Sequence, residues 1–406
     1  MRHWCLGDFI KAALIASLLL TSPTVAWADD KRCYSAGDWW LPAGERHTST
    51  AQLVNELYRR PVILLGEQHD LADHHRWQLH TISALYGKRS DIALGFEMFP
   101  RRVQTVLDRW VAGELSESAF LKQVEWRSIW GYDPALYMPI FHFARINAIP
   151  MLALNINRDT ARVAGDKGVH AMTASEREGV SLPVPATDDY LNLLAQTFSG
   201  HDHAEDATVE NGDIKKDKRF QRFVDAQQLW DRAMAEGIAK AIDGDNPPLV
   251  IAIMGSGHIV ERFGVPHQLA DLGITDSAVL LPSVPDMPCA EISARSADAV
   301  FGLPQFAEAD TPRKQRLGVH LNDDEGKIKI TRIVDDSIAQ RCGLEEGDTF
   351  VSIAERGVHS IDDVVEAVDA MQAGTWLPIR VMRGDTTLDL VAKFPNAPQQ
   401  GDKEPH

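Results

Sequence analysis

The chain has 406 residues, of which 44% are hydrophobic and 24% are charged, and its formal net charge is −17. This is the composition of a globular protein with room for two or three domains. The acidic excess, which no basic run offsets, argues against nucleic acid or an anionic membrane surface as the main partner.

The N-terminus predicts export. Arg2 and Lys11 precede an apolar core at 12–20. Ala26 and Ala28 follow this core at the spacing of a signal-peptidase site. The apolar run is too short for a membrane span, which needs about 20 such residues. We therefore predict a signal peptide at 1–28, a periplasmic mature protein and no membrane span after cleavage.

The cysteines beyond the predicted signal peptide number three. In an oxidising compartment Cys33 and Cys289 could form a disulfide that ties the N-terminal tail to the main domain. Two positions in a sequence do not fix the geometry that such a bond needs. Cys342 is predicted to be a buried free thiol.

Apolar, partly β-branched runs predict the buried strands of a parallel sheet. Helical patterns alternate with these runs, which implies right-handed crossovers. The predicted strands are 62–65, 92–97, 149–155, 248–254 and 278–282, and the predicted helices are 49–60, 70–86, a helical region at 101–147, and 216–242. The predicted fold class is therefore α/β, with a parallel sheet flanked by helices.

The domain organisation follows from where these patterns stop. A tail at 29–48 precedes the α/β domain at 49–285, which carries a helical insertion at 156–244. A linker rich in Ala, Ser, Asp and Pro is predicted at 286–315. A small domain at 316–394 has short strand patterns and one helical pattern, and a disordered tail at 395–406 ends the chain.

Polar residues follow four of the predicted strands. Because the carboxyl ends of parallel strands lie at one edge of a sheet, these side chains could converge in one crevice. In chain order they are Glu67 and His69, then Glu97, then Asn155 and Asn157, and then His258.

Two kinds of chemistry suit such a crevice. Histidines and glutamates could bind a divalent metal, or they could act as a general acid/base pair. A hydrolase that uses Glu67, His69, Glu97 and His258 is therefore one of the functions that we consider. No zinc-protease helix motif, Cys-x-x-Cys or Gly-x-Ser-x-Gly nucleophile elbow accompanies them.

Several of these segments together resemble the ChaN-like haem-binding uptake family. They are Leu65-Gly-Glu-Gln-His-Asp70, Asp73-His-His-x-x-Gln78, Gly95-Phe-Glu-Met-Phe99, the strand at 149–155 and Met254-Gly-Ser-Gly-His258. The resemblance implies a parallel-sheet α/β domain that holds haem at a dimer interface, with a tyrosine on the iron and a histidine and a lysine on the propionates. The same positions also resemble TIKI-type metalloproteases and erythromycin-esterase-like hydrolases, in which such residues bind metal or act as a base.

On this resemblance Tyr137 is the first candidate for the iron ligand, and Tyr132 is the second. A tyrosinate oxygen is a hard ligand that suits ferric iron, and metal binding lowers the pKa of the phenol. The propionate histidine could be His69, His74 or His258, and no lysine matches the family position.

The small domain resembles a PDZ domain of the bacterial exported type. Its strongest signature is Ser337-Ile-Ala-Gln-Arg-Cys-Gly-Leu-Glu-Glu-Gly-Asp348. The resemblance implies that an extended peptide adds a strand to this domain, with the peptide carboxylate near Leu317, Gly318 and Val319. The sequence thus predicts an exported haem-binding protein for haem or iron uptake, whose PDZ domain recruits a peptide or protein.

Overall fold

The computed structural model describes residues 34–201, 214–283, 292–304, 315–324 and 326–395. The chain divides into two compact units between residues 305 and 306. The predicted signal peptide, both cysteines of the predicted disulfide and residues 396–406 lie outside the described residues. Within the described ranges, no helix combines the length and the apolar character that crossing a bilayer requires.

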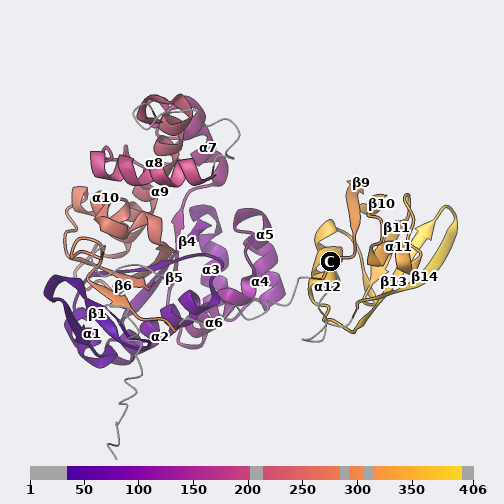
Figure 1. Cartoon of the computed structure of the whole chain (residues 1–406), viewed down its shortest axis with the longest axis horizontal. Coiled ribbons are helices and arrows are strands. Elements are labelled where there is room, and N and C mark those ends of the chain that lie inside the picture. Colours follow the sequence, from indigo (N-terminus) through magenta and orange to yellow (C-terminus); the bar gives the residue numbers. More distant parts are fainter. Residues whose placement is uncertain (1–33, 202–213, 284–291, 305–314, 325, 396–406) are drawn as a thin grey trace, which may run out of the picture. The chain divides into compact units, whose positions relative to one another are not determined.

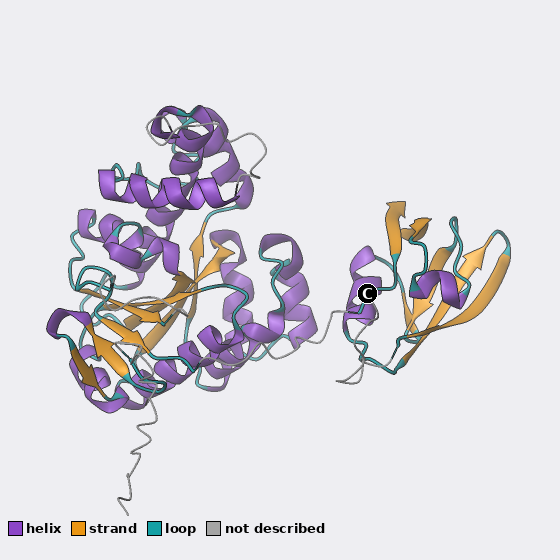
Figure 2. Ribbon diagram, viewed as in Figure 1, coloured by secondary structure: helices purple, strands orange, loops and turns teal. Residues whose placement is uncertain are grey.

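An eight-stranded, mostly parallel sheet forms the centre of the first unit (Figure 2). Its order is β2-β1-β8-β7-β3-β6-β4-β5; the β1–β2 and β1–β8 pairs are antiparallel, and the other pairs are parallel. This confirms the predicted α/β class. The strands are β1 (Trp39–Leu41), β2 (Arg46–Thr48), β3 (Val62–Glu67), β4 (Ile92–Pro100), β5 (Met151–Asn155), β6 (Leu249–Gly255), β7 (Ser277–Pro282) and β8 (Ala299–Phe301).

Helices cover both faces of this sheet. The helices of the described part of this unit are α1 (Thr50–Leu57), α2 (Ala72–Lys88), α3 (Gln104–Val111), α4 (Glu117–Gln123), α5 (Trp126–Ile129), α6 (Met138–Ile146), α7 (Arg158–Lys167), α8 (Asp188–His201), α9 (Lys218–Ala241) and α10 (Val265–Asp271). Figure 1 shows α7, α8 and α9, which belong to the predicted insertion, grouped at one end of the unit.

The central strand β3 shows why helices must cover both faces of the sheet. Ile63 and Leu65 belong to one buried cluster, which includes side chains of α2, α3 and α6. Val62 and Leu64 point the other way, into a second cluster with side chains of α9 and α10. Alternate residues of a strand face opposite sides, so a wholly apolar strand is stable only between two layers of helices.

Three short strands extend the sheet within segments predicted to lack structure. β1 and β2 come from the predicted tail, and β8 comes from the predicted linker. Trp39 of β1 is fully buried, with its ring 5.9 Å from Trp77 and 5.0 Å from Phe301. Three-residue strands are too short to show a periodic pattern, and they depend on the sheet edge that they join.

The second unit is an antiparallel sheet with two helices. Its strand order is β14-β13-β11-β10-β9, and β12 pairs with β11. Helix α12 packs against β9 and β11, and Cys342 is a free, half-buried thiol. The elements are β9 (Val319–Asp324), β10 (Lys327–Ile333), α11 (Ile338–Cys342), β11 (Thr349–Ile353), β12 (Arg356–Gly357), α12 (Ile361–Asp369), β13 (Trp376–Arg383) and β14 (Thr386–Lys393).

Candidate functional site

The sequence predicts that polar residues meet at the carboxyl edge of the sheet, and the structure brings them together there. Glu67 ends β3, and Glu97 lies in the second half of β4. His258 ends a 3-10 turn that directly follows β6, the strand between β3 and β4. All three are buried, although each is polar. The backbone at Gly255 passes so close that a Cβ atom there would lie 3.2 Å from Nε2 of His69 and 3.6 Å from Oε2 of Glu97.

The carboxylate of Glu67 accepts hydrogen bonds from several side chains that surround it. Its Oε1 accepts hydrogen bonds from the Tyr137 hydroxyl at 2.7 Å and from Nδ1 of His69 at 2.8 Å. Its Oε2 accepts a hydrogen bond from Nε2 of Gln78 at 2.9 Å and lies 3.4 Å from Nδ1 of His75. Burial opposes ionisation, but the two histidines outweigh it and lower the pKa of Glu67 to about 2. Glu67 is therefore a buried anion at neutral pH.

A second buried cluster connects β4 to the insertion helices. Oε2 of Glu97 accepts the backbone N–H of Gly255 at 2.6 Å, and its Oε1 lies 3.2 Å from Nε2 of His258. Nδ1 of His258 lies 2.5 Å from Asp231 on α9, which also accepts the hydroxyl of Tyr190 on α8 at 2.8 Å. The imidazole ring of His258 is thus held between two carboxylates.

The charges of this second cluster follow from that geometry. Burial alone would lower the pKa of His258, but Glu97 and Asp231 raise it to about 10. Burial likewise opposes the ionised form of Glu97, and His258 still lowers the pKa of that carboxyl group. The cluster therefore contains an imidazolium at neutral pH, and both of its ring nitrogens are engaged.

Three aromatic rings form the exposed side of the site. The ring of His69 lies 4.7 Å from that of Trp130 and 5.4 Å from that of Tyr132, and the His69 side chain is 27% exposed. Among the described residues, Nε2 of His69 has no hydrogen-bond partner. Burial lowers the pKa of His69, but the hydrogen bond to Glu67 outweighs it, so that the pKa is raised. We name His69, Trp130 and Tyr132 the aromatic mouth.

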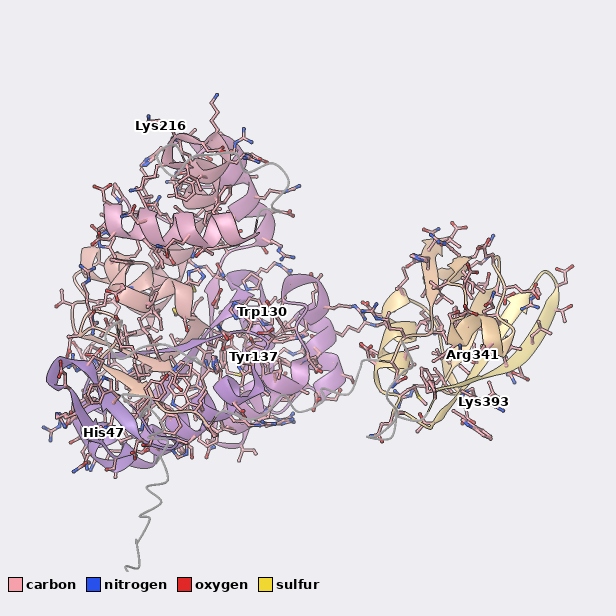
Figure 3. The ribbon with its side chains drawn as sticks, viewed as in Figure 1. His47, Trp130, Tyr137, Lys216, Arg341 and Lys393 are labelled. Carbon is pink, nitrogen blue, oxygen red and sulfur yellow. The ribbon has the colours of Figure 1, made fainter. Side chains whose placement is uncertain are left out.

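The two candidate tyrosines differ in their surroundings. Figure 3 shows Tyr137 beside Trp130 within the unit. Tyr137 is fully buried, and burial together with the nearby carboxylate of Glu67 raises its pKa far above the ordinary value. Tyr132 is 38% exposed at the aromatic mouth. In this arrangement Tyr137 is a neutral hydrogen-bond donor, and its predicted role as an iron ligand stays a prediction.

The remaining predicted residues have structural contacts. Asn155 donates from Nδ2 to the backbone oxygen of Glu97 at 2.9 Å, which ties β5 to β4. Asn157 accepts a hydrogen bond from Arg102 at 2.7 Å, at the start of α7. Nδ1 of His74 accepts the backbone N–H of Gln68 at 2.8 Å, and burial lowers the pKa of His74 to about 4.

Gln78 on α2 was among the polar residues that the sequence placed on one helix face, but the partners that α9 supplies were not singled out. Gln227 and Asp231 on α9 are buried polar residues of that helix. Polar residues at three- and four-residue spacing within an apolar stripe were the signal that could have found them.

The divalent-metal prediction requires a set of ligands that the described residues do not bring together. Across the described residues, no group of three or more His, Cys, Asp or Glu side chains is placed to hold a metal ion. The carboxylate oxygens of Glu67 and Glu97 already accept hydrogen bonds or contact histidines. The cluster can hold protons and orient His69.

The predicted peptide-binding loop lies at the start of β9. Leu317 is buried in the core of the second unit, and its backbone oxygen accepts the N–H of Ala339 at 2.8 Å. Gly318 has a φ of +84°, and a Cβ atom there would lie 2.3 Å from Cβ of Ser337. Val319 begins β9, which is an edge strand of the sheet. Glycine is therefore required at the turn that leads into this free edge.

Comparison with known proteins gives matches for both units. A family model described as "Haem-binding uptake, Tiki superfamily, ChaN" matches residues 53–269, and a PDZ domain model matches residues 315–393. No curated protein matches the chain.

Solved structures also match parts of the chain. A structure of cofacial heme binding to ChaN of Campylobacter jejuni is 19% identical, covers 65% of this chain and 95% of that chain, and has a TM-score of 0.51, so the fold is shared. The HtrA3 PDZ domain bound to a phage-derived ligand is 21% identical and covers 20% of this chain and 84% of that chain, with a TM-score of 0.18. A serine endoprotease from Yersinia pestis is 19% identical over 21% of this chain and 29% of that chain, with a TM-score of 0.19.

The charge of His258 predicts how stability depends on pH. Because its pKa is raised from 6.5 to about 10 on folding, its contribution is complete below pH 6.5 and is lost as the pH rises toward 10. This loss amounts to at most about 5 kcal/mol in the free energy of unfolding. Urea unfolding at a series of pH values should show the decline, and His258→Gln should remove that part of it. His142→Gln, at an exposed histidine, should keep the slope of the wild type; equal slopes in all three proteins would contradict the assignment.

Proposed function

The chain belongs to the ChaN family of haem-binding uptake proteins in the Tiki superfamily, and we propose that it is exported, binds haem at the aromatic mouth and recruits a partner through its PDZ domain. The observation that carries the haem site is the aromatic mouth itself, which places an exposed phenol next to a partly exposed imidazole. The cofacial haem binding of the Campylobacter jejuni protein supports it.

The fit of haem to these residues favours one of the two candidate tyrosines as the iron ligand. A haem iron needs an accessible phenolate, and the Tyr137 hydroxyl is buried and donates to Glu67. Tyr132 is exposed and lies beside His69. We therefore propose Tyr132 as the iron ligand and keep Tyr137 as the group that positions Glu67.

The propionates need a cation or a hydrogen-bond donor. His69 fits this need, because its pKa is raised, its side chain is partly exposed and its Nε2 has no hydrogen-bond partner among the described residues. His258 does not fit, because both of its nitrogens contact buried carboxylates. Bound haem would supply redox-active iron, and the protein would contribute the ligand, the cation and the stacking surface of Trp130.

A hemin titration followed by absorbance tests the haem site. The wild type should develop a tyrosinate-type charge-transfer band, because Tyr132 can approach the iron, and Tyr132→Phe should lose that band. Tyr86→Phe removes a hydroxyl on α2 outside the site and should keep it. Loss of the band in Tyr137→Phe but not in Tyr132→Phe would assign the iron to Tyr137. No spectral change in the wild type would refute haem binding.

The recruitment proposal depends on the free edge of β9. An extended peptide can pair with an edge strand while its terminal carboxylate accepts backbone N–H groups at the turn. Gly318 permits that turn, and helix α12 packs against β9.

A labelled peptide with an apolar last residue should therefore bind the full chain in a fluorescence-polarisation assay. Amidation of its C-terminus should weaken binding by about tenfold, because the charged acceptor is lost. Gly318→Ala should also weaken it. Gly384→Ala, which places the same side chain at a positive φ in the β13–β14 turn, is the matched control and should bind normally. Equal affinity for free and amidated peptides would argue against carboxylate capture.

The export proposal rests on the pattern of residues 1–28. Cell fractionation should place the mature chain in the periplasm, and N-terminal sequencing should begin at Asp29. An added charge in the apolar run, Leu18→Arg, should retain the precursor in the cytoplasm. A chain that keeps Met1 in the periplasm would contradict cleavage at this position.

A further inference from the structure

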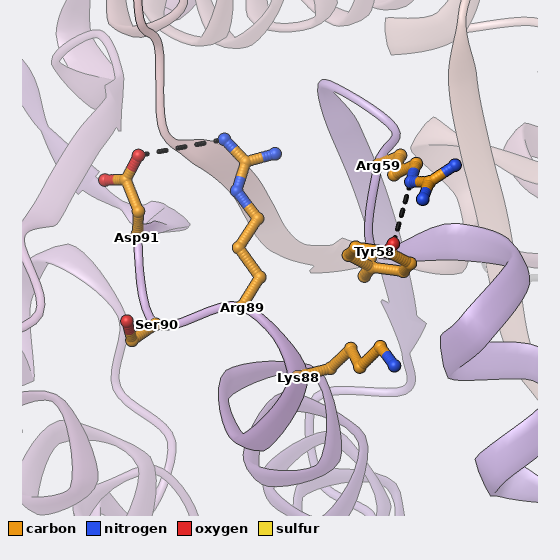
Figure 4. A pocket seen from close by; sticks show the side chains of 6 residues that line it. All are labelled: Tyr58, Arg59, Lys88, Arg89, Ser90 and Asp91. Atoms are coloured by element: carbon orange, nitrogen blue, oxygen red, sulfur yellow. Dashed lines mark hydrogen bonds and ion pairs between the residues drawn. The ribbon is translucent and has the colours of Figure 1, made fainter.

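A solvent-open hollow of about 510 Å³ lies on the first unit where α1 and α2 end (Figure 4). It is lined by Tyr58, Arg59, Lys88, Arg89, Ser90 and Asp91. These residues immediately precede β3 and β4, so the hollow lies at the amino ends of strands whose carboxyl ends carry Glu67 and Glu97. It is therefore separate from the aromatic mouth, at the opposite edge of the sheet.

Two cations from different elements converge on one ring in this hollow. The guanidinium carbon of Arg59 lies 5.1 Å from the centre of the Tyr58 ring, and Nζ of Lys88 lies 5.2 Å from it. Nε of Arg59 also donates to the Tyr58 hydroxyl at 2.7 Å. Within the part of the chain that the structure describes, neither cation has a carboxylate as an ion-pair partner. Two like charges beside the same ring repel each other, and an anion between them or nearby would offset this repulsion.

A third cation is held in place beside them. Nη2 of Arg89 donates to the backbone oxygen of Pro247 at 2.7 Å and lies 3.8 Å from Oδ2 of Asp91. Asp91 is the one carboxylate in the wall, and its side chain is 69% exposed. Three cations and one carboxylate give the hollow a formal charge of +2, on a chain whose formal charge is −17.

We propose that this hollow binds a phosphate group. A phosphate monoester carries a charge of about −1.5 to −2 at neutral pH, which matches the excess charge of the lining residues. The guanidinium groups can donate to two phosphate oxygens at once, Lys88 adds a compact charge, and the hydroxyl group of Ser90 is a further donor. The face of Tyr58 offers a surface for the carbon atoms attached to the phosphate. The phosphate belongs either to a soluble ester or to a lipid head group.

Calorimetry with inorganic phosphate and the full chain tests the site. The double variant Arg59→Gln/Lys88→Gln should bind phosphate about tenfold more weakly, since it loses two exposed charge contacts. The matched control is Arg76→Gln/Lys122→Gln, which removes the same charge from α2 and α4 outside the hollow and should change the affinity by less than about twofold. No saturable binding by the wild type, or an equal loss in both double variants, would overturn the proposal.

Vesicles distinguish the two sources of the phosphate. Sedimentation with phosphatidylcholine vesicles that contain phosphatidic acid, whose head group is a phosphate monoester, would support the site and assign it to a lipid head group if it is lost in Arg59→Gln/Lys88→Gln but kept in the control. Phosphate binding in solution without sedimentation would support the site and assign it to a soluble ester. Sedimentation that the double variant retains in full, with no binding of inorganic phosphate, would contradict the proposal. Hemin spectra should not change in either double variant, because the aromatic mouth lies at the other edge of the sheet.

Discussion

Two buried carboxylates hold the α/β unit together at the carboxyl edge of its sheet. An ionised carboxylate removed from water is costly unless hydrogen bonds and opposite charges compensate for it. Glu67 obtains this compensation from α2 and from Tyr137 at the start of α6, and Glu97 obtains it from Gly255 and His258. Through Asp231 and Tyr190, the second cluster reaches α9 and α8 of the insertion. The helices on both sides are therefore bound to the sheet edge by charge as well as by apolar packing.

Both clusters place their charged groups in the interior, and in the Glu67 cluster the His69 side chain is partly exposed. Most donors around Glu67 serve to keep it ionised, and the ionised group in turn fixes the ring of His69 through Nδ1. A histidine fixed in this way presents Nε2 in one direction, which a freely rotating side chain would not do. The buried network thus prepares the aromatic mouth, although the network itself is not accessible to a ligand. This division also explains why residues of similar type at neighbouring strand ends have different roles.

The sequence predicted the central strands and their polar ends because both are local features. Val62 to Leu65 is an apolar run, and Glu67, His69, Glu97 and His258 follow such runs directly, so strand periodicity and parallel topology were enough to bring them to one edge. The partners of these residues were not local. Asp231 is far from His258 in the chain, and Tyr137 comes to Glu67 only when α6 packs on the sheet. β1 and β8 were not predicted for a related reason. A three-residue strand depends on its neighbour in the sheet more than on its own side chains.

The charge of the chain constrains every ligand considered for it. Haem propionates, a peptide carboxylate and a phosphate are all anions, and the chain as a whole is acidic. At physiological ionic strength the field of a surface charge decays over about 8 Å, so that distant acidic residues matter less than the groups in contact with the ligand. Each site must then supply its own positive potential. In the proposals above, His69 would supply it at the aromatic mouth, Arg59 and Lys88 at the amino edge of the sheet, and backbone N–H groups near Gly318 in the PDZ unit. Raising the salt concentration should therefore weaken the exposed Arg59 and Lys88 contacts more than a carboxylate held by backbone N–H groups, because the short, directed hydrogen bonds of the latter are screened less.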